Sequence, residues 1–329
     1  MAKKATTEPA AGQPAQQVSW HPQEASMLMQ LPQELRNQIY SELFHSTQMT
    51  HVSGRSIDPS SHLALLRTCK RIHAEVGDSW LKQVEFRFDD LEAMLDTLAN
   101  IPEEKLALIR HVRVPSKSLK ILVADEGKLY LLHAALQLLP GLQLDRLTVV
   151  AGDMMVEMEY KTLDFLIKYS DGWKELNFLS PDSRLLGYRH APVTGRFRYL
   201  RKPQPCSWQK QLEDLDGSHT SPSVAVYRAM SAGPVGSTLD PGQRVPFEQN
   251  LAEGQTLQEF VGREDPALCS PGELQKEMLV IVKRGKGVDY TQRWDGVSFA
   301  GEIREHYKIA TWPEIERCHI PDDDWFYTI

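Results

Sequence analysis

The sequence predicts an α/β protein in which short parallel strands are separated by helices. Between residues 85 and 180, β-prone runs alternate with amphipathic segments that have helical periodicity. Strands joined through helical crossovers pair in parallel. The chain has 329 residues, of which 41% are hydrophobic and 25% charged. These values are ordinary for a globular protein with a sizeable core, so we expect one compact part and one looser part.

The predicted strands are short runs that each begin soon after the end of a helix. They cover Glu85–Phe88, Ile109–Val114, Arg146–Val150 and Glu175–Leu179. The repeated unit resembles a degenerate leucine-rich repeat, whose period is about 20 to 29 residues. A small open α/β sheet with the same strand order is the alternative. We expect a short, irregular αβ arc with parallel strands over residues 85–180.

The segments between these strands place leucines at helical spacing. Asp89 and Glu92 form a capping box for the first helix, and the later helices end at Pro140-Gly141 and at Gly172. The apolar helical positions are Leu91, Met94, Leu95 and Leu98 in the first helix, Leu129, Leu132, Leu136 and Leu139 in the second, and Leu163, Leu166 and Ile167 in the third. We expect Val112, Val114, Leu147, Val149, Leu176 and Phe178 to be buried in one parallel sheet, flanked on one side by the helices bearing Leu95, Leu132 and Leu166.

Two short amphipathic helices are predicted before the first of these strands. The first begins at Pro32, which suits the first turn of a helix. Its apolar positions are Leu31, Leu35, Ile39 and Leu43, with Tyr40 and Phe44 widening the apolar face. The second begins at Ser60 or Ser61 and places Leu65, Cys69, Ile72 and Val76 at the same period. We expect the two helices to pack on each other.

This pair of helices resembles the F-box, and more closely the F-box-like proteins of filamentous fungi. The matching residues are the Leu-Pro-Gln-Glu-Leu-Arg-Asn-Gln-Ile-Tyr run from Leu31 and the Thr-Cys-Lys-Arg-Ile-His-Ala-Glu run from Thr68, within residues 27–81. Ile72 stands where F-boxes commonly carry a tryptophan, and a polar insert from His45 to Ser60 separates the helices.

The resemblance implies a substrate-recruiting subunit of a cullin-type ubiquitin ligase. Its partners would be the ligase adaptor and a protein substrate, with the adaptor binding Leu31, Pro32, Leu35, Ile39 and Leu43. The alternative is a scaffold protein in which this apolar face packs against the chain's own next domain and binds no adaptor. Exposure of the face in the folded chain discriminates between these hypotheses.

The rest of the chain has no comparable motif. Residues 1–20 have the composition of a disordered tail, residues 181–211 form a basic and aromatic connector, and residues 277–329 form a closing segment that begins with an apolar strand at 277–283. Residues 212–275 hold ten acidic and three basic residues, so the net charge of this segment, −7, equals that of the whole chain. We expect this segment to be a flexible insert, with the stretch Asp214–Gln243 largely irregular because it is rich in Gly, Pro and Ser.

Composition and motifs argue against several classes of function. The sequence contains none of the common hydrolase, metalloprotease, dinucleotide or calcium-loop motifs, and the run Arg284-Gly285-Lys286-Gly287 fits a turn with solvated basic residues better than a phosphate loop. Asp322–Asp324 fit a solvated acidic turn better than a metal site. We therefore expect no catalytic activity and neither a cofactor nor a metal.

The cysteines and the charge give expectations about environment and partners. Cys69, Cys206, Cys269 and Cys318 lie far apart and lack zinc-ligand spacing, which favours reduced cysteines. No secretory signal and no run of about twenty apolar residues is present, so a cytoplasmic or nuclear protein without a membrane span is expected. The net charge disfavours nucleic acid as a partner, although basic and aromatic residues alternate from Arg184 to Lys202.

Overall fold

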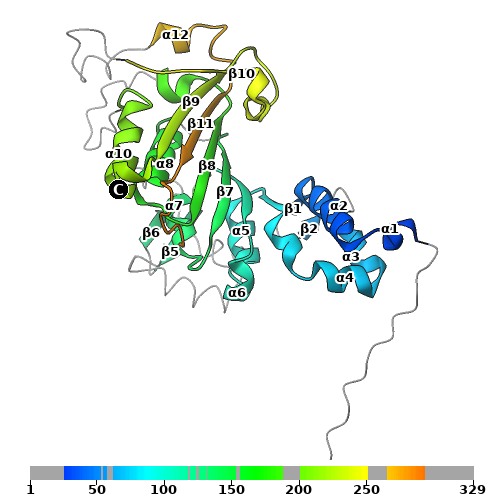
Figure 1. The fold of residues 1–329 in the computed structure, drawn as a ribbon. Coiled ribbons are helices and arrows are strands. Elements are labelled where there is room, and N and C mark those ends of the chain that lie inside the picture. The colour runs from blue at the N-terminus through cyan, green and yellow to red at the C-terminus, as the bar shows by residue number, and fades with distance from the viewer. Residues whose placement is uncertain are drawn as a thin grey trace, which may run out of the picture.

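The computed structural model shows a nine-stranded mixed sheet with helices packed on one of its faces (Figure 1). The strand order is β10-β9-β11-β8-β7-β4-β3-β1-β2. The structure describes residues 26–52, 55–57, 62–117, 119–123, 126–130, 132–152, 156–187, 201–250 and 265–292.

Five adjacent strands in the sheet are parallel and follow the order of the chain. They are β1 (Gln48–Val52), β3 (Glu85–Phe88), β4 (His111–Pro115), β7 (Leu144–Val150) and β8 (Trp173–Ser180). The antiparallel strands lie outside them, with β2 (Arg55–Ile57) at one edge and β11 (Met278–Lys283), β9 (Ser223–Ala229) and β10 (Arg244–Pro246) towards the other. The predicted α/β class and its parallel strands are confirmed. An arc of repeats and a small open sheet share this strand order, so the repeat interpretation remains a prediction.

The predicted sheet core is confirmed residue by residue. Val112, Leu147 and Leu176 are aligned across β4, β7 and β8, as are Val114, Val149 and Phe178, and all six side chains are fully buried. Side chains alternate between the two faces of a strand. This alternation places the six residues on one face and leaves the polar residues between them on the other.

The helices cover the face that bears these apolar residues. α5 (Leu91–Leu98) contacts β3 and β4, α7 (Leu132–Gln137) packs between α5 and α8 (Val156–Tyr169), and α10 (Cys206–Asp216) packs on α8 and β9. The predicted inward positions Leu95, Leu132 and Leu166 are all buried in this layer. The cap of α5 is Asp90, whose Oδ1 accepts from the Ala93 N–H at 2.6 Å, rather than the predicted Asp89.

Short helices complete the architecture. They are α1 (Met27–Gln30), α2 (Gln33–His45), α3 (Leu65–Thr68), α4 (Lys70–Val76), α6 (Glu103–Leu106), α9 (Arg184–Gly187) and α12 (Pro266–Cys269), with 3-10 turns at η1 (His62–Ala64), η2 (Ser79–Lys82), η3 (Ser218–Thr220), η4 (Ser237–Leu239) and η5 (Pro241–Gln243). Among the described residues, no helix is long and apolar enough to span a membrane.

The N-terminal helices lie beyond the β2 edge of the sheet (Figure 1). The predicted first helix is confirmed as α2. The second helix was expected to run unbroken from Ser60 or Ser61, which lie outside the described residues, but it is interrupted at Cys69, whose backbone is extended. Its Sγ accepts from the Ile72 N–H at 3.4 Å and so caps α4. The polar segment between the two predicted helices forms β1 and β2, so the sheet continues into residues 27–81.

Two expectations about irregular or helical segments are wrong. Leu129, assigned from its spacing to a helix, lies in β6 (Glu126–Tyr130), which pairs with β5 (Leu119–Val123) in a separate hairpin. The stretch Asp214–Gln243, expected to be largely irregular, contains β9, an interior strand hydrogen-bonded on both sides. Val224 and Val226 alternate with less buried residues along β9 and supply its core contacts, which outweigh the Gly, Pro and Ser residues around them.

Candidate functional site

The outer face of α2 leaves apolar side chains open to solvent. Leu35 is 45% exposed and Ile39 43% exposed, and Pro32 is also exposed. Leu31 and Leu43 are half-buried, and Leu43 packs against the core. The structure therefore places the predicted adaptor face on the surface, with only its ends partly covered.

The opposite face of α2 is fixed by an ion pair that the sequence analysis did not identify. Arg36 is buried and donates to both carboxylate oxygens of Glu75 in α4, at 3.0 and 2.5 Å. Hydrogen bonding from Arg36 lowers the pKa of Glu75, which also accepts from the Tyr40 hydroxyl at 3.3 Å. Together with buried Phe44, this contact turns Leu35 and Ile39 outward.

A second surface with functional character is the face of the sheet opposite the helices. Two rows of aligned residues cross it, and both are mostly polar. One row is Glu85, His111, Arg146, Glu175 and Lys283, and the next is Arg87, Arg113, Thr148, Asn177 and Ile281. We call this pair of rows the polar sheet face. Sequence alternation could have revealed it, because each polar residue neighbours a predicted core residue.

Charges on the polar sheet face are only partly paired. Glu175 accepts from Arg146 Nε at 3.2 Å, and its other carboxylate oxygen lies 3.4 Å from Lys283 Nζ. Burial raises the pKa of Glu85, although Arg113, Arg146 and Arg87 act in the opposite direction. The two rows contain three arginines and Lys283 against Glu85 and Glu175, so basic side chains outnumber acidic ones on the polar sheet face.

A hollow of about 310 Å³ lies in this face, between the sheet and the segment 233–244. Leu239 and Arg244 form its rim, while Thr148 and Asn177 line it from the sheet. A Cβ at Gly236 would be in ordinary van der Waals contact with Arg113 Nη2, at 3.8 Å, so the segment lies beside the end of the Arg113 side chain. This segment thus encloses one end of the polar sheet face.

Glu277 holds the rim in place. Its buried carboxylate accepts from the N–H groups of Gly236 and Thr238 at 2.5 and 2.8 Å, and from the Thr238 hydroxyl at 2.6 Å. Arg244 in turn donates to the Thr238 carbonyl at 2.9 Å. Hydrogen bonds to a carboxylate are among the stronger ones in proteins, so these contacts hold the loop that borders the hollow.

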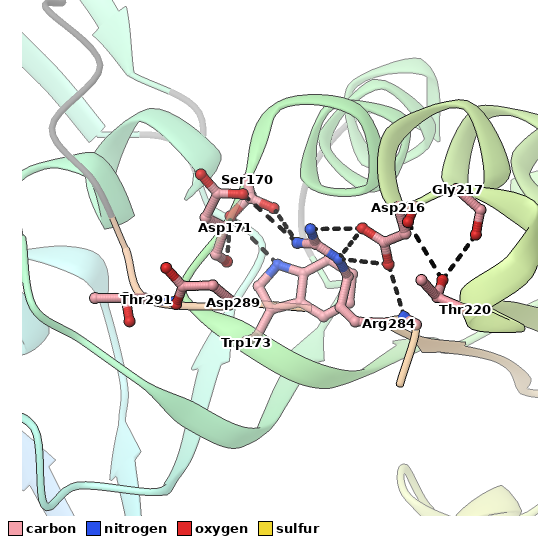
Figure 2. A network of polar contacts seen from close by, with 10 residues as sticks. Ser170, Asp171, Trp173, Asp216, Gly217, Thr220, Arg284, Asp289 and Thr291 are labelled. Atoms are coloured by element: carbon pink, nitrogen blue, oxygen red, sulfur yellow. Dashed lines mark hydrogen bonds and ion pairs between the residues drawn. The ribbon is translucent and has the colours of Figure 1, made fainter. Parts of the chain in front are cut away.

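A buried network around Arg284 lies away from this hollow and acts in folding (Figure 2). The guanidinium of Arg284 donates to the Asp216 carboxylate at 2.7, 2.8 and 2.9 Å and lies over the Trp173 ring. The expectation of a solvated Arg284 is therefore wrong, because Asp216 at the end of α10 supplies a buried counter-charge. The network joins α10 to the ends of β8 and β11.

Other predicted features carry no site among the described residues. There, no group of three or more His, Cys, Asp or Glu residues is placed to hold a metal ion. Cys69 and Cys206 are free thiols, and the Cys269 Sγ donates to the Gly187 carbonyl at 2.9 Å. Cys318 and Asp322–Asp324 lie outside the described residues. Most of the basic and aromatic cluster, residues 188–200, also lies outside them.

Comparison of the chain with protein-family models, with curated proteins and with solved structures finds no match. A function for the chain therefore has to be inferred from the α2 face and the polar sheet face.

Proposed function

We propose that this protein is a substrate-recruiting, F-box-like subunit of a cullin-type ubiquitin ligase. In this proposal the outer face of α2 binds the ligase adaptor, and the polar sheet face binds the protein to be modified. The observation that carries the proposal is the exposure of Leu35 and Ile39 on a helix whose opposite face is locked in the core.

The energetics of the α2 face support a docking role. Full burial of a Leu or Ile side chain contributes about 1.5 to 3 kcal/mol, so covering the exposed portions of Leu35 and Ile39 would add roughly 1 kcal/mol each. Exposed Pro32 lies at the start of the same helix, and half-buried Leu31 and Leu43 extend the apolar strip at its two ends. An adaptor that covers this strip gains burial that the free chain does not supply.

One observation favours the alternative of a scaffold protein without an adaptor. β1 pairs with β3, and residues from Met29 to Val282 belong to one continuous hydrophobic core. The N-terminal helices could therefore serve only to cover the end of the sheet. The two proposals differ in whether the outer face of α2 has a partner.

Co-purification with the ligase adaptor tests the proposal. The variant Leu35→Ser with Ile39→Ser removes two exposed apolar side chains, and the matched control is Leu215→Ser with Met230→Ser, whose side chains are 43% and 57% exposed elsewhere. We expect the α2 variant to lose the adaptor and the control to retain it. Both should keep nearly the wild-type melting temperature, because exposed substitutions usually change stability by about 0.5 kcal/mol or less.

Absence of the adaptor from the wild-type preparation, or equal adaptor recovery with the α2 variant, would favour the scaffold alternative. A large loss of melting temperature in the α2 variant would also favour it, because the face would then contribute to the core.

A further inference from the structure

We infer that the polar sheet face binds an extended acidic peptide segment. This inference rests on the proposed function, since it names the chemistry of the recruited protein, but its chemistry is argued from the sheet alone. The segment would lay alternate carboxylate side chains on the basic residues of the face and donate a backbone N–H into the hollow.

The polar sheet face carries an excess of basic side chains. Arg87, Arg113, Arg146, Arg244 and Lys283 stand on or beside the face, against Glu85 and Glu175. This local excess of positive charge occurs in a chain whose net charge is −7. It favours an anionic partner over a neutral or basic one.

Arg87 and Arg113 are aligned side by side on the parallel strands β3 and β4. Like charges held side by side on neighbouring strands repel each other. Arg87 is exposed and Arg113 is half-buried, so both remain within reach of a ligand. An acidic side chain placed between them would relieve this repulsion.

Asn177 lines the hollow and is only 5% exposed. Its Nδ2 donates to Glu175 at 3.3 Å, whereas its Oδ1 has no hydrogen-bond partner among the described residues. A buried acceptor without a partner is costly. A ligand that donates an N–H would satisfy it, and a peptide backbone offers such a group beside its acidic side chains.

The size and shape of the hollow select a segment rather than a folded domain. Its volume of about 310 Å³ is at the small end for ligand pockets and admits only a few groups. In an extended peptide, alternate side chains point the same way. One such set could contact the arginines while the backbone passes Asn177.

Fluorescence anisotropy with a labelled peptide in which Asp alternates with Ala tests the inference on the full-length protein. The reference peptide has Asn at every Asp position. We expect Arg87→Gln with Arg113→Gln to weaken binding of the Asp peptide by about tenfold or more, a typical cost for lost charged pairs. The control, Lys174→Gln with Lys210→Gln, removes equal charge from exposed positions outside the polar sheet face and should bind like the wild type.

Two further variants separate a built site from general attraction. Glu85→Gln removes a negative charge from the face and should tighten binding. Asn177→Leu removes the unsatisfied acceptor and should weaken binding several-fold without lowering the melting temperature. These results, with preference for the Asp over the Asn peptide, would support the inference.

The inference is overturned if the Asp and Asn peptides bind alike, if the lysine control loses as much affinity as the arginine variant, or if Asn177→Leu binds unchanged. Adaptor recovery is measured on the same proteins. The Leu35→Ser with Ile39→Ser variant should bind the Asp peptide like the wild type even though it loses the adaptor. Failure of the proposed function therefore appears in adaptor recovery, whereas failure of this inference appears in peptide affinity.

Discussion

The buried pair of Arg284 and Asp216 gives the sharpest expectation about stability. Their side chains are 3% and 0% exposed, and the Asp216 carboxylate also accepts from the Gly285 N–H at 2.7 Å. Asp216→Asn keeps the shape of the side chain but removes the nearer, buried counter-charge of the Arg284 guanidinium and leaves the partly exposed Asp171 at 3.6 Å. Breaking a buried ion pair in this way costs about 3 to 5 kcal/mol, and we expect the lower end because the amide retains part of the hydrogen bonding.

Thermal and urea denaturation followed by circular dichroism measure this effect. A loss of about 3 kcal/mol corresponds to a fall in melting temperature of at most roughly 6 to 12 °C, the range for folded domains of about 150 to 250 residues. The double variant Asp216→Leu with Arg284→Met should recover most of the loss, because it removes both buried charges together.

The matched control is Asp78→Asn, which breaks the exposed pair of Asp78 with Lys105 at 3.6 Å. Exposed pairs contribute between about 0 and 1 kcal/mol, so this variant should unfold close to the wild type. The reasoning is refuted if Asp216→Asn is no less stable than Asp78→Asn, or if the double variant is less stable than Asp216→Asn alone.

Two other expectations concern acid stability and the segment containing β9. Burial, with a smaller contribution from Lys161, lowers the pKa of His133 from 6.5 to about 4. Below pH 6.5 the unfolded chain binds a proton at His133 that the folded protein does not. The free energy of unfolding should therefore fall by up to about 1.4 kcal/mol per pH unit as the pH falls from about 6.5 towards 4. In urea denaturation, His133→Gln should reduce this dependence on pH. An unchanged slope would exclude His133 as its source. In limited proteolysis, cleavage within Ser223–Ala229 should come no earlier than cleavage within Trp173–Ser180, because both strands are interior to the sheet; early cleavage in β9 would contradict that packing.

Parallel strands and their core residues could be predicted because each strand has its own apolar run. The apolar runs around Val112, Leu147 and Leu176 each follow a helix and a turn. The local pattern of apolar residues is therefore sufficient to identify these runs as strands. The apolar run in β11 was found for the same reason. Because consecutive parallel strands joined by helices lie side by side, the order of these runs in the sequence also predicts the order of the strands in the sheet.

The remaining strands could not be predicted because their partners lie far away in the chain. β1 is a polar run, Gln48-Met49-Thr50-His51-Val52, and becomes a strand by pairing with β3. β9 does show alternating valines, but the surrounding acidic, Gly-rich and Pro-rich composition concealed that signal. Its strand character depends on hydrogen bonds to β11 and β10 on either side.

The sites were accessible to sequence analysis to different degrees. The apolar face of α2 follows from helical spacing, yet spacing alone could not decide which side of the helix is buried. That depends on Arg36, whose partner Glu75 is 39 residues later in the chain. The polar sheet face depends on strand register, and its hollow on a segment, Gly236 to Arg244, that no sequence motif connects to β7 or β8.

Hydrogen exchange of the protein with and without the purified ligase adaptor tests the central claim most directly. We predict slower exchange across Gln33–His45 when the adaptor is present, with no change across Cys206–Asp216, which packs on β9 near the opposite edge of the sheet. Equal exchange of α2 with and without a saturating adaptor, or protection confined to elements other than α2, would contradict the account.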